Sequence, residues 1–329
     1  MTIMKKTAKK ILTLGITFAL LAATLLGCGA VSEPTTVRVG SMKGPTSIGL
    51  VFLMEEDEAG KADNDYEFQM VTGADELLPL MIKGELDIAL VPANVAAVLY
   101  NKTEGGVAVI DINTRGVLYM VSGDTTMQDF TDLKGKTIYL TGKGTTPDYV
   151  LQYLLAQNGM TTEDCTLEYK SEATEVAAVL AEDSNAVGLL PQPFVTAACA
   201  QNEALSIVFS MDEEWSKVCG DEGASTVTGV TVVRKEFLEK NEDAVKAFLK
   251  EHADSADAIN KDTEVGAGLV VKAGIIAKEP LAKKAIPFCS IVCTTGEEMK
   301  TALSAYLEVL FGQSPEAVGG KLPGEDFYY

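Results

Sequence analysis

The chain has few of the residues that most enzymes use for nucleophilic or metal chemistry. Its 329 residues include one histidine, His252, and one tryptophan, Trp215. A Ser-His-Asp or Cys-His site would depend on that histidine, and no serine lies in a Gly-x-Ser-x-Gly sequence. The Walker loop, the His-Glu-x-x-His motif and the Cys-x-x-Cys pair are absent. The sequence therefore disfavours hydrolases of these classes, a nucleotide loop and a zinc site.

The cysteines form no simple pairing pattern. The five that follow Cys28 are an odd set and cannot all pair with one another: Cys165, Cys199, Cys219, Cys289 and Cys293. A Cys289–Cys293 bridge stays possible, and we expect mostly buried free thiols. His252 lies in a segment with amphipathic helical spacing, which predicts a solvent-exposed histidine.

Positive charge and long apolar runs are also scarce. Lysine and arginine number 27 against 47 aspartate and glutamate, for a formal net charge of −20. Such a surface repels nucleic acid and anionic lipid headgroups, so neither is an expected partner. After Leu26 no apolar stretch approaches the length of a membrane span, which predicts a soluble body. We expect no cofactor and no metal, because the acid-rich stretches lack calcium-loop spacing.

The first 28 residues have the pattern of an export signal. Four lysines precede an apolar run from Ile11 to Leu26, and Cys28 follows Gly27. This end resembles a bacterial lipobox, which implies an acylated, palmitate-type Cys28 at the mature N-terminus. We expect a signal peptide at 1–27, a tether at 28–36 and a lipid anchor on the outer face of the bacterial cell membrane. An ordinary signal peptide or a membrane anchor is the alternative.

The remaining chain alternates short apolar strands with helical segments. Strands are expected at 37–41, 66–71, 87–91 and 107–112, and the pattern restarts after a crossover at 116–121. A second crossover is expected at 228–233, followed mainly by helices. This order predicts an α/β protein of two lobes, each a mostly parallel sheet flanked by helices. We expect the first lobe and the C-terminal helices to comprise 37–118 and 228–329, and the second lobe to comprise 119–227.

Ligands of such sheets bind beyond the carboxyl ends of the strands, and this rule selects five loops. Their glycines, hydroxyls and helix starts suit a small polar or anionic ligand. In the first lobe the candidates are Ser41, Lys43, Thr46, Asn94 as a helix cap, and Asn113. In the second lobe they are Lys143, Thr145, Thr146, Gln192 and Phe194. For each loop the alternative is an ordinary capped turn with a solvated lysine. Trp215 is expected to pack in a core or between lobes.

The order of several segments resembles a known family. VRVGSMKGPTSIGL, KGELDIALVPANVAAVLYN, DLKGKTIYLTGKGTTPDYVLQYLL, LPQPFVTAA and VVRKEFLEKNEDAVKAFLKE together are similar to periplasmic-type substrate-binding proteins of ABC importers. The most similar group binds nitrate, taurine, aliphatic sulfonates or thiamine-precursor pyrimidines. The resemblance implies a type II two-lobed fold with the ligand in the cleft, contacted by Ser41, Lys43, Thr46, Asn94, Thr145, Thr146 and Gln192. Sulfonate and taurine members usually show a Trp-x-Pro-Phe-like segment where this chain has LPQPF.

The resemblance implies a lipoprotein that captures a small polar or anionic organic solute by lobe closure. It would deliver this solute, of the sulfonate, nitrate or pyrimidine class, to an ABC permease, as a monomer without enzymatic activity. Paired helix N-termini together with Lys43 and Lys143 would select a small anion or a polar heteroaromatic. The alternatives are a sensory ligand-binding lipoprotein and, on the same fold, a pyrimidine-synthase-like enzyme; the single histidine and the lipobox argue against the enzyme.

Overall fold

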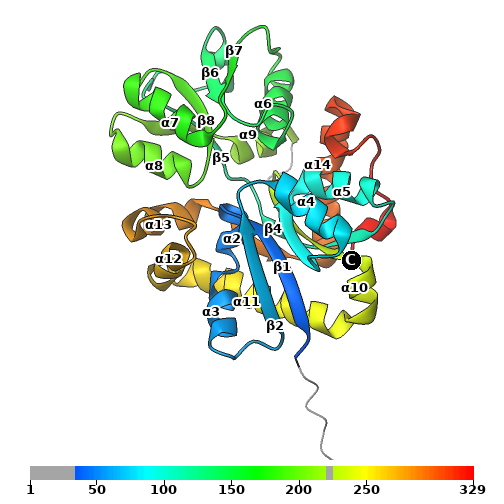
Figure 1. Cartoon of the computed structure of the whole chain (residues 1–329). Helices are drawn as coiled ribbons and strands as arrows, with labels where there is room; N and C mark the ends of the chain where they lie inside the picture. The colour runs from blue at the N-terminus through cyan, green and yellow to red at the C-terminus, as the bar shows by residue number, and fades with distance from the viewer. Residues whose placement is uncertain (1–33, 220–224) are drawn as a thin grey trace, which may run out of the picture. The chain divides into compact units, whose positions relative to one another are not determined.

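Two β-sheets with flanking helices make up the described part of the chain (Figure 1). The computed structural model describes residues 34–219 and 225–329. The expected signal peptide (1–27), the expected lipidation residue Cys28 and most of the tether therefore lie outside the described residues. Within the described residues no helix is both long enough and apolar enough to cross a membrane.

The first sheet has six strands in the described residues, and most of them run in one direction. Their spatial order is β11 (Ile291–Thr294), β4 (Val107–Thr114), β10 (Gly229–Arg234), β3 (Ile88–Pro92), β1 (Thr36–Met42) and β2 (Asp65–Val71). β1 pairs in parallel with β2 and β3, whereas β10 is antiparallel to β3 and β4. β11, also antiparallel, was not expected from the sequence, because this segment is short and lies between helices.

The second sheet has the same arrangement as five strands of the first. Its five strands in the described residues are β7 (Thr166–Tyr169), β6 (Thr137–Leu140), β8 (Val187–Pro191), β5 (Leu118–Ser122) and β9 (Ser206–Ser210). In this order they correspond to β2, β1, β3, β10 and β4. β6 is parallel to β7 and β8, and β5 is antiparallel to β8 and β9. The predicted α/β architecture of two lobes is thus confirmed, with two mixed sheets.

The mixed character of both sheets follows from the two crossovers. β5 and β10 each begin where neighbouring strands end: Leu118 pairs with Pro191, and Gly229 pairs with Pro92. A strand that arrives from the other lobe enters at the carboxyl edge of the sheet, so it must run against its neighbours. The crossovers therefore bring the carboxyl edges of both sheets to the same region.

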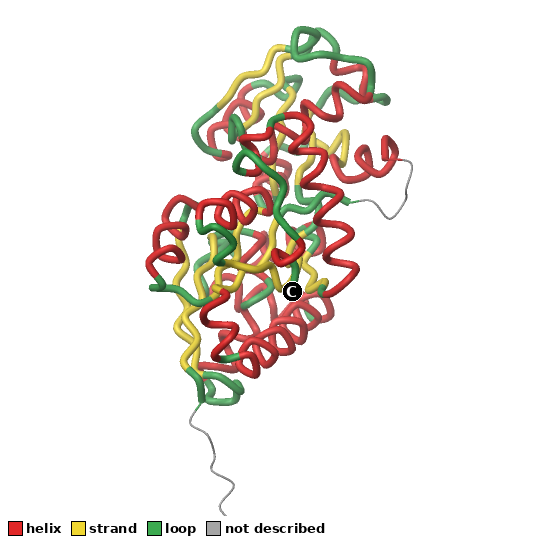
Figure 2. The backbone as a smooth tube through the Cα atoms, turned by 90° about the vertical axis from the view of Figure 1, so that its right-hand side faces the viewer, coloured by secondary structure: helices red, strands yellow, loops and turns green. Residues whose placement is uncertain are grey.

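Helices cover both faces of each sheet (Figures 1 and 2). On the first sheet, apolar side chains of one face pack against α3 (Val51–Glu58), α10 (Lys235–Lys240) and α11 (Glu242–Lys261). The other face packs against α4 (Ala74–Lys83), α5 (Ala93–Lys102) and α14 (Gly296–Gln313).

On the second sheet the alternation of side chains along each strand divides the core in the same way. Val121 and Leu190 pack with α7 (Ala173–Glu182) and α8 (Phe194–Gln201). Their neighbours Met120 and Leu189 pack on the other face, with α6 (Thr146–Gln157) and α9 (Met211–Cys219). The remaining elements are α2 (Pro45–Ile48), α12 (Thr263–Lys272), α13 (Glu279–Ala285) and the 3₁₀ turns η1 (Phe130–Leu133), η2 (Ile286–Phe288), η3 (Pro315–Val318) and η4 (Glu325–Phe327).

Asp212, at the start of α9, contacts the segments that lead into both crossovers. Its carboxylate accepts hydrogen bonds from the Thr226 amide (2.7 Å), the Thr226 hydroxyl (2.9 Å) and the Ser225 hydroxyl (3.0 Å). It also packs against Gly116 of the first crossover, where an added Cβ would lie 2.4 Å from Asp212 Cγ. A residue larger than glycine would force these two segments apart.

His252 is buried, contrary to the expectation of a solvent-exposed helix face. Its exposed fraction is 0 %, and its neighbours on α11, Phe248 and Ser255, are buried as well. The spacing of apolar residues identified the helix correctly, but α11 is covered on more than one side. α12 and α13 add an apolar cluster to the one formed with the first sheet. His252 itself lies against Asp111 of β4, Cys293 of β11 and Gly49, and these residues enclose it.

A buried ion cluster ties three strands together at the opposite, amino edge of the first sheet. Asp87 accepts hydrogen bonds from Arg38 Nη2 (2.6 Å), Arg38 Nε (2.8 Å) and Arg234 Nη2 (2.7 Å). Burial alone would raise the pKa of Asp87, but the bonds from the two arginines outweigh it and the pKa lies below its usual value.

Replacing Asp87 with asparagine should lower the free energy of unfolding by about 2 to 3 kcal/mol, because two arginines lose their buried counter-ion. A depressed carboxyl pKa stabilises the fold above the unfolded pKa and ceases to do so as pH falls through the folded value. The difference between wild type and variant should therefore shrink below about pH 4 in urea titrations. Asp254→Asn, in the exposed Lys250–Asp254 pair, is the control and should leave stability unchanged. Equal stability of Asp87→Asn and wild type would contradict the ion-cluster interpretation.

Candidate functional site

The residues predicted from the cleft rule lie at the carboxyl edges of the two sheets. Ser41 is near the end of β1, and Lys43 and Thr46 follow it. Asn94 follows β3, and Asn113 is near the end of β4. Lys143, Thr145 and Thr146 follow β6, and Gln192 and Phe194 follow β8. Because the crossovers join these same edges, the two groups belong to one region of the molecule.

Six of the ten predicted residues are buried polar side chains. Each is at most 8 % exposed, and none carries a formal charge: Ser41, Thr46, Asn94, Asn113, Thr146 and Gln192. Buried polar groups are costly unless hydrogen bonds satisfy them. Their concentration at the carboxyl edges is therefore a stronger indication of a binding region than the loop sequences alone.

Asn94 and Thr146 connect the two lobes directly. The Thr146 hydroxyl, in the first turn of α6, donates to Asn94 Oδ1 over 3.3 Å. The Asn94 amide donates in turn to the Ala317 carbonyl oxygen, also over 3.3 Å. Asn94 is not the expected N-cap, since α5 begins at Ala93 with Pro92 as its cap. Both hydrogen bonds are long, so they offer little resistance to replacement by a ligand.

The loop after β1 lies against the end of β4. Ser47 donates to Ser41 Oγ (2.8 Å), and Thr46 donates to the Met42 carbonyl oxygen (3.1 Å). An added Cβ on Gly229 would lie 2.4 Å from Asn113 Oδ1 and 2.7 Å from Thr46 Cγ2. Glycine at position 229 thus lets Thr46 and Asn113 approach each other. Lys43 is exposed on the same loop.

The first turn of α6 contains a buried acidic side chain. Asp148, 3 % exposed, accepts hydrogen bonds from the Gly144 amide (2.7 Å) and the Tyr169 hydroxyl (2.7 Å). Burial, followed by this bond to Asp148, raises the pKa of Tyr169. Thr145 is exposed and donates to the Gly142 carbonyl oxygen (2.6 Å), which closes its own turn. Part of the positive end of the α6 dipole is therefore neutralised internally.

Lys143, in the same loop, is exposed, and its ammonium lies 5.2 Å from the ring centroid of Tyr169. That separation is within the range of a cation–π contact. Its predicted contact with a ligand stays a prediction.

Gln192 carries an unused hydrogen-bond donor. Its Oε1 accepts from the Thr196 hydroxyl (2.8 Å), and its backbone amide donates to Val117 of the first crossover (3.0 Å). In the described residues, Nε2 is buried without a partner. Phe194 is half-buried and packs on the apolar cluster of β8, α7 and α8. Gln192 is thus positioned to gain from a ligand acceptor.

A buried hydrogen-bond chain leads away from Asn113 into the first lobe. Thr114 donates to Asn113 Oδ1 (2.9 Å), Asn113 Nδ2 donates to Thr231 (3.1 Å), and Thr231 donates to Asp111 Oδ1 (2.9 Å). Asp111 Oδ2 then lies 3.3 Å from Nδ1 of His252. Sequence reasoning missed this chain, although an aspartate inside the apolar run VAVIDINT is a signal that could have found it.

The same chain contains the one group of potential metal ligands in the described residues. Asp111, His252 and Cys293 place one ligand atom each within 4.8 Å of one another. Both carboxylate oxygens of Asp111 already face hydrogen-bond partners. Burial, then the nearby Asp111 charge, raises the pKa of the Cys293 thiol, which opposes the thiolate form that metals bind. We therefore treat this group as a hydrogen-bonded network.

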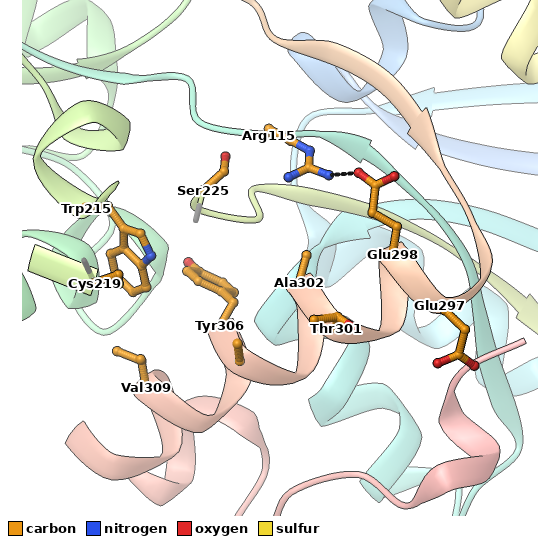
Figure 3. A pocket seen from close by; sticks show the side chains of 11 residues that line it. Arg115, Trp215, Cys219, Ser225, Glu297, Glu298, Thr301, Ala302, Tyr306 and Val309 are labelled. Carbon is orange, nitrogen blue, oxygen red and sulfur yellow. Dashed lines mark hydrogen bonds and ion pairs between the residues drawn. The ribbon is translucent and has the colours of Figure 1, made fainter. Parts of the chain in front are cut away.

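A cavity of about 580 Å³ lies beside α14 on the crossover side (Figure 3). Arg115 pairs there with Glu298 at 2.8 Å, and Trp215 and Tyr306 form part of the wall. Trp215 is 3 % exposed, with ring centroids 4.6 Å from Tyr153 and 5.5 Å from Tyr306. This confirms its expected packing role. Burial raises the pKa of Tyr306, and the neighbouring Thr146 hydroxyl partly offsets this.

Comparison with known proteins agrees with this architecture. The model of the family described as "ABC transporter, phosphonate, periplasmic substrate-binding protein" matches residues 59–249. No curated protein matches the chain in sequence.

Several solved structures share the fold. An ABC transporter protein from Parabacteroides distasonis is 25% identical, with a TM-score of 0.76 over 90% of this chain and 99% of that one. The periplasmic aliphatic sulphonate binding protein SsuA from Escherichia coli is 14% identical, with a TM-score of 0.69 over 89% and 93%. The nitrate-binding protein NrtA from Synechocystis is 14% identical, with a TM-score of 0.60 over 87% and 84%. Because the family match spans more than half of a chain with this two-lobed α/β fold, the protein belongs to the phosphonate-type periplasmic substrate-binding family of ABC transporters.

Proposed function

We propose that this chain is the extracytoplasmic solute-binding lipoprotein of an ABC importer. In this proposal residues 1–27 are removed as a signal peptide, and a lipid on Cys28 anchors the monomer to the outer face of the cell membrane. The lobes, 37–118 with 228–329 and 119–227, close on a solute and present it unchanged to the permease. Family membership supports the transport role, and the lipobox-like N-terminus supports the anchor.

One observation carries the binding proposal: uncharged, buried hydrogen-bonding side chains from both lobes converge at the carboxyl edges, and Thr146 reaches Asn94 across the lobes. A solute placed among them would gain hydrogen bonds that these side chains make poorly or not at all without it. Gln192 Nε2 gains the most, because an unpaired buried donor costs about 1 to 3 kcal/mol.

The solute we propose is a small polar or anionic organic molecule of the sulfonate, phosphonate, nitrate or pyrimidine class. Among the described residues, the buried polar set contains no lysine and no arginine. Recognition would therefore rely on hydroxyls, side-chain amides and the N-termini of α5, α6 and α8. The names of SsuA and NrtA, which refer to aliphatic sulphonate and nitrate, support this range. The buried Asp148 favours a solute of low charge.

Closure would follow from differential affinity. A solute that contacts both lobes binds the closed arrangement more tightly than the open one. The difference between these two binding free energies is the amount by which it stabilises the closed arrangement. The two crossovers, held by Asp212 against Gly116, are the segments about which the lobes would move.

Thr146→Ala should weaken solute binding about tenfold, because it removes a buried hydroxyl at the contact of the two lobes. Thr145→Ala is the matched control. Its hydroxyl is exposed and closes its own turn, so the dissociation constant should change less than twofold. Isothermal titration calorimetry on both variants tests this, with thermal melting to confirm that each folds. An equal effect of the two substitutions would remove Thr146 from the site.

The solute itself can be found by thermal shift on the form that starts after Cys28. The panel contains alkyl sulfonates, alkyl phosphonates, nitrate, taurine, aromatic carboxylates and thiamine-precursor pyrimidines. At a hundredfold excess over Kd, a true solute adds about 2.7 kcal/mol to the free energy of unfolding. We expect a rise in Tm with one class. No rise with any compound would contradict the proposed solute range, and mass spectrometry of co-purifying molecules would then identify the replacement.

A further inference from the structure

We propose that Asp111 and His252 are positioning residues that fix the amide of Asn113, and thereby set which solute groups the first lobe recognises. The proposal rests on the function proposed above, because it takes Asn113 to be part of the solute site. It assigns a role to the single histidine of the sequence and to the buried aspartate beside it.

In the hydrogen-bond chain from Thr114 to His252, the direction of every bond follows from Asp111, near its buried end. In this proposal Asp111 is ionised: a carboxylate has no hydrogen to donate, so it accepts from both of its neighbours. His252 must therefore carry its hydrogen on Nδ1, 3.3 Å from Asp111 Oδ2. Thr231 must direct its hydroxyl hydrogen to Asp111 Oδ1 over 2.9 Å.

This arrangement leaves Thr231 only lone pairs to offer to Asn113. The amide group of Asn113 must then turn its nitrogen toward Thr231, at 3.1 Å, and its oxygen toward Thr114, at 2.9 Å. All five side chains from Thr114 to His252 are at most 2 % exposed, so bulk solvent does not reach them. A reversed amide would place the Asn113 oxygen against the lone pairs of Thr231, so that two acceptors face each other.

The outer end of the chain lies where a solute is expected. Asn113 Oδ1 and Thr46 Cγ2 approach the same point above Gly229, at the carboxyl edge of the first sheet. With the amide fixed, its remaining donor and acceptor positions are fixed as well. The pattern offered to a solute is then set by Asp111, a residue that does not itself reach the site.

Two other groups face this chain and are held constant in the test. The Cys293 thiol on β11 lies near Asp111, and Gly49 lies against Nε2 of His252, where an added Cβ would be 3.3 Å away. Ser255, on α11 with His252, accepts a hydrogen bond from the Leu53 amide (3.1 Å) and is not a member of the hydrogen-bond chain. Ser255→Ala therefore perturbs the same core without changing the polarity of Asn113.

The test compares two probes of similar shape on the tag-free protein that starts after Cys28. Methanesulfonate offers acceptors only, whereas methylphosphonate, at a pH where it keeps one P–OH, offers a donor as well. Asp111→Asn can donate to Thr231 and so reverse the chain. It should shift the ratio of the two dissociation constants about tenfold, and Thr231→Val should also shift it. Thr231→Ser, which restores the hydroxyl, and Ser255→Ala should keep the wild-type ratio.

A second readout does not need a solute. In ¹⁵N spectra the single histidine makes the imidazole signals unambiguous, and wild type should show hydrogen on Nδ1. The side-chain amide hydrogens of Asn113, assigned with Asn113→Asp, should exchange about tenfold faster in Thr231→Val.

Binding of both probes with an unchanged ratio in Asp111→Asn and Thr231→Val would overturn the positioning role while leaving the solute site intact. Failure of wild type to bind either probe would exclude the sulfonate and phosphonate classes from the proposed solute range. The positioning role would then be decided by the spectra: hydrogen on Nε2 of His252, or unchanged exchange at Asn113, would overturn it.

Discussion

The contact between Asp212 and the two crossovers is the constraint on which the proposed solute region depends. The crossovers link the carboxyl edges of two separate sheets, and Asp212 accepts hydrogen bonds from one while packing on Gly116 of the other. This holds the connecting segments at one fixed separation near the edges that carry the candidate residues. Side chains as short as Thr146 and Asn94 can then meet across the lobes.

Charge is distributed unequally between the two edges of the first sheet. The amino edge contains the buried Asp87 cluster, with Arg38 and Arg234 as counter-ions. The carboxyl edge contains hydroxyls and amides, and the buried carboxylate of Asp111 on β4 accepts a hydrogen bond from Thr231 and faces His252. The ion cluster stabilises the strands at a distance from the solute region, so the fold does not need charges where the solute would bind.

The alternation of strands and helices could be predicted because each short apolar segment ends at a turn rich in glycine, proline or serine. VRVGS before MKGPTS is an example. The loops that carry candidate residues followed from that order. What the sequence could not show depends on tertiary contacts. β11 pairs with β4 although Ile291 lies 177 residues after Thr114. His252 is buried among residues that are distant in sequence: Gly49, Asp111 and Cys293.

The sequence was equally unable to show the side-chain interactions of residues 142–148, at the start of α6. Nothing in GKGTTPD distinguishes Thr146, which reaches Asn94, from Thr145, which closes its own turn. The partner of Asp148, Tyr169, lies 21 residues further along the chain. Residue type and spacing thus selected the loop as a candidate, and the fold determines which of its side chains reaches the other lobe.

The position of Trp215 gives the protein an internal optical reporter. The indole ring belongs to the second lobe but lies 5.5 Å from Tyr306 on α14, a helix that packs on the first sheet. Since the sequence has no other tryptophan, any emission excited at its red edge comes from this junction. Relative movement of the lobes changes the polarity and the quenching groups around one fluorophore, so the native protein signals its own conformational state without a label.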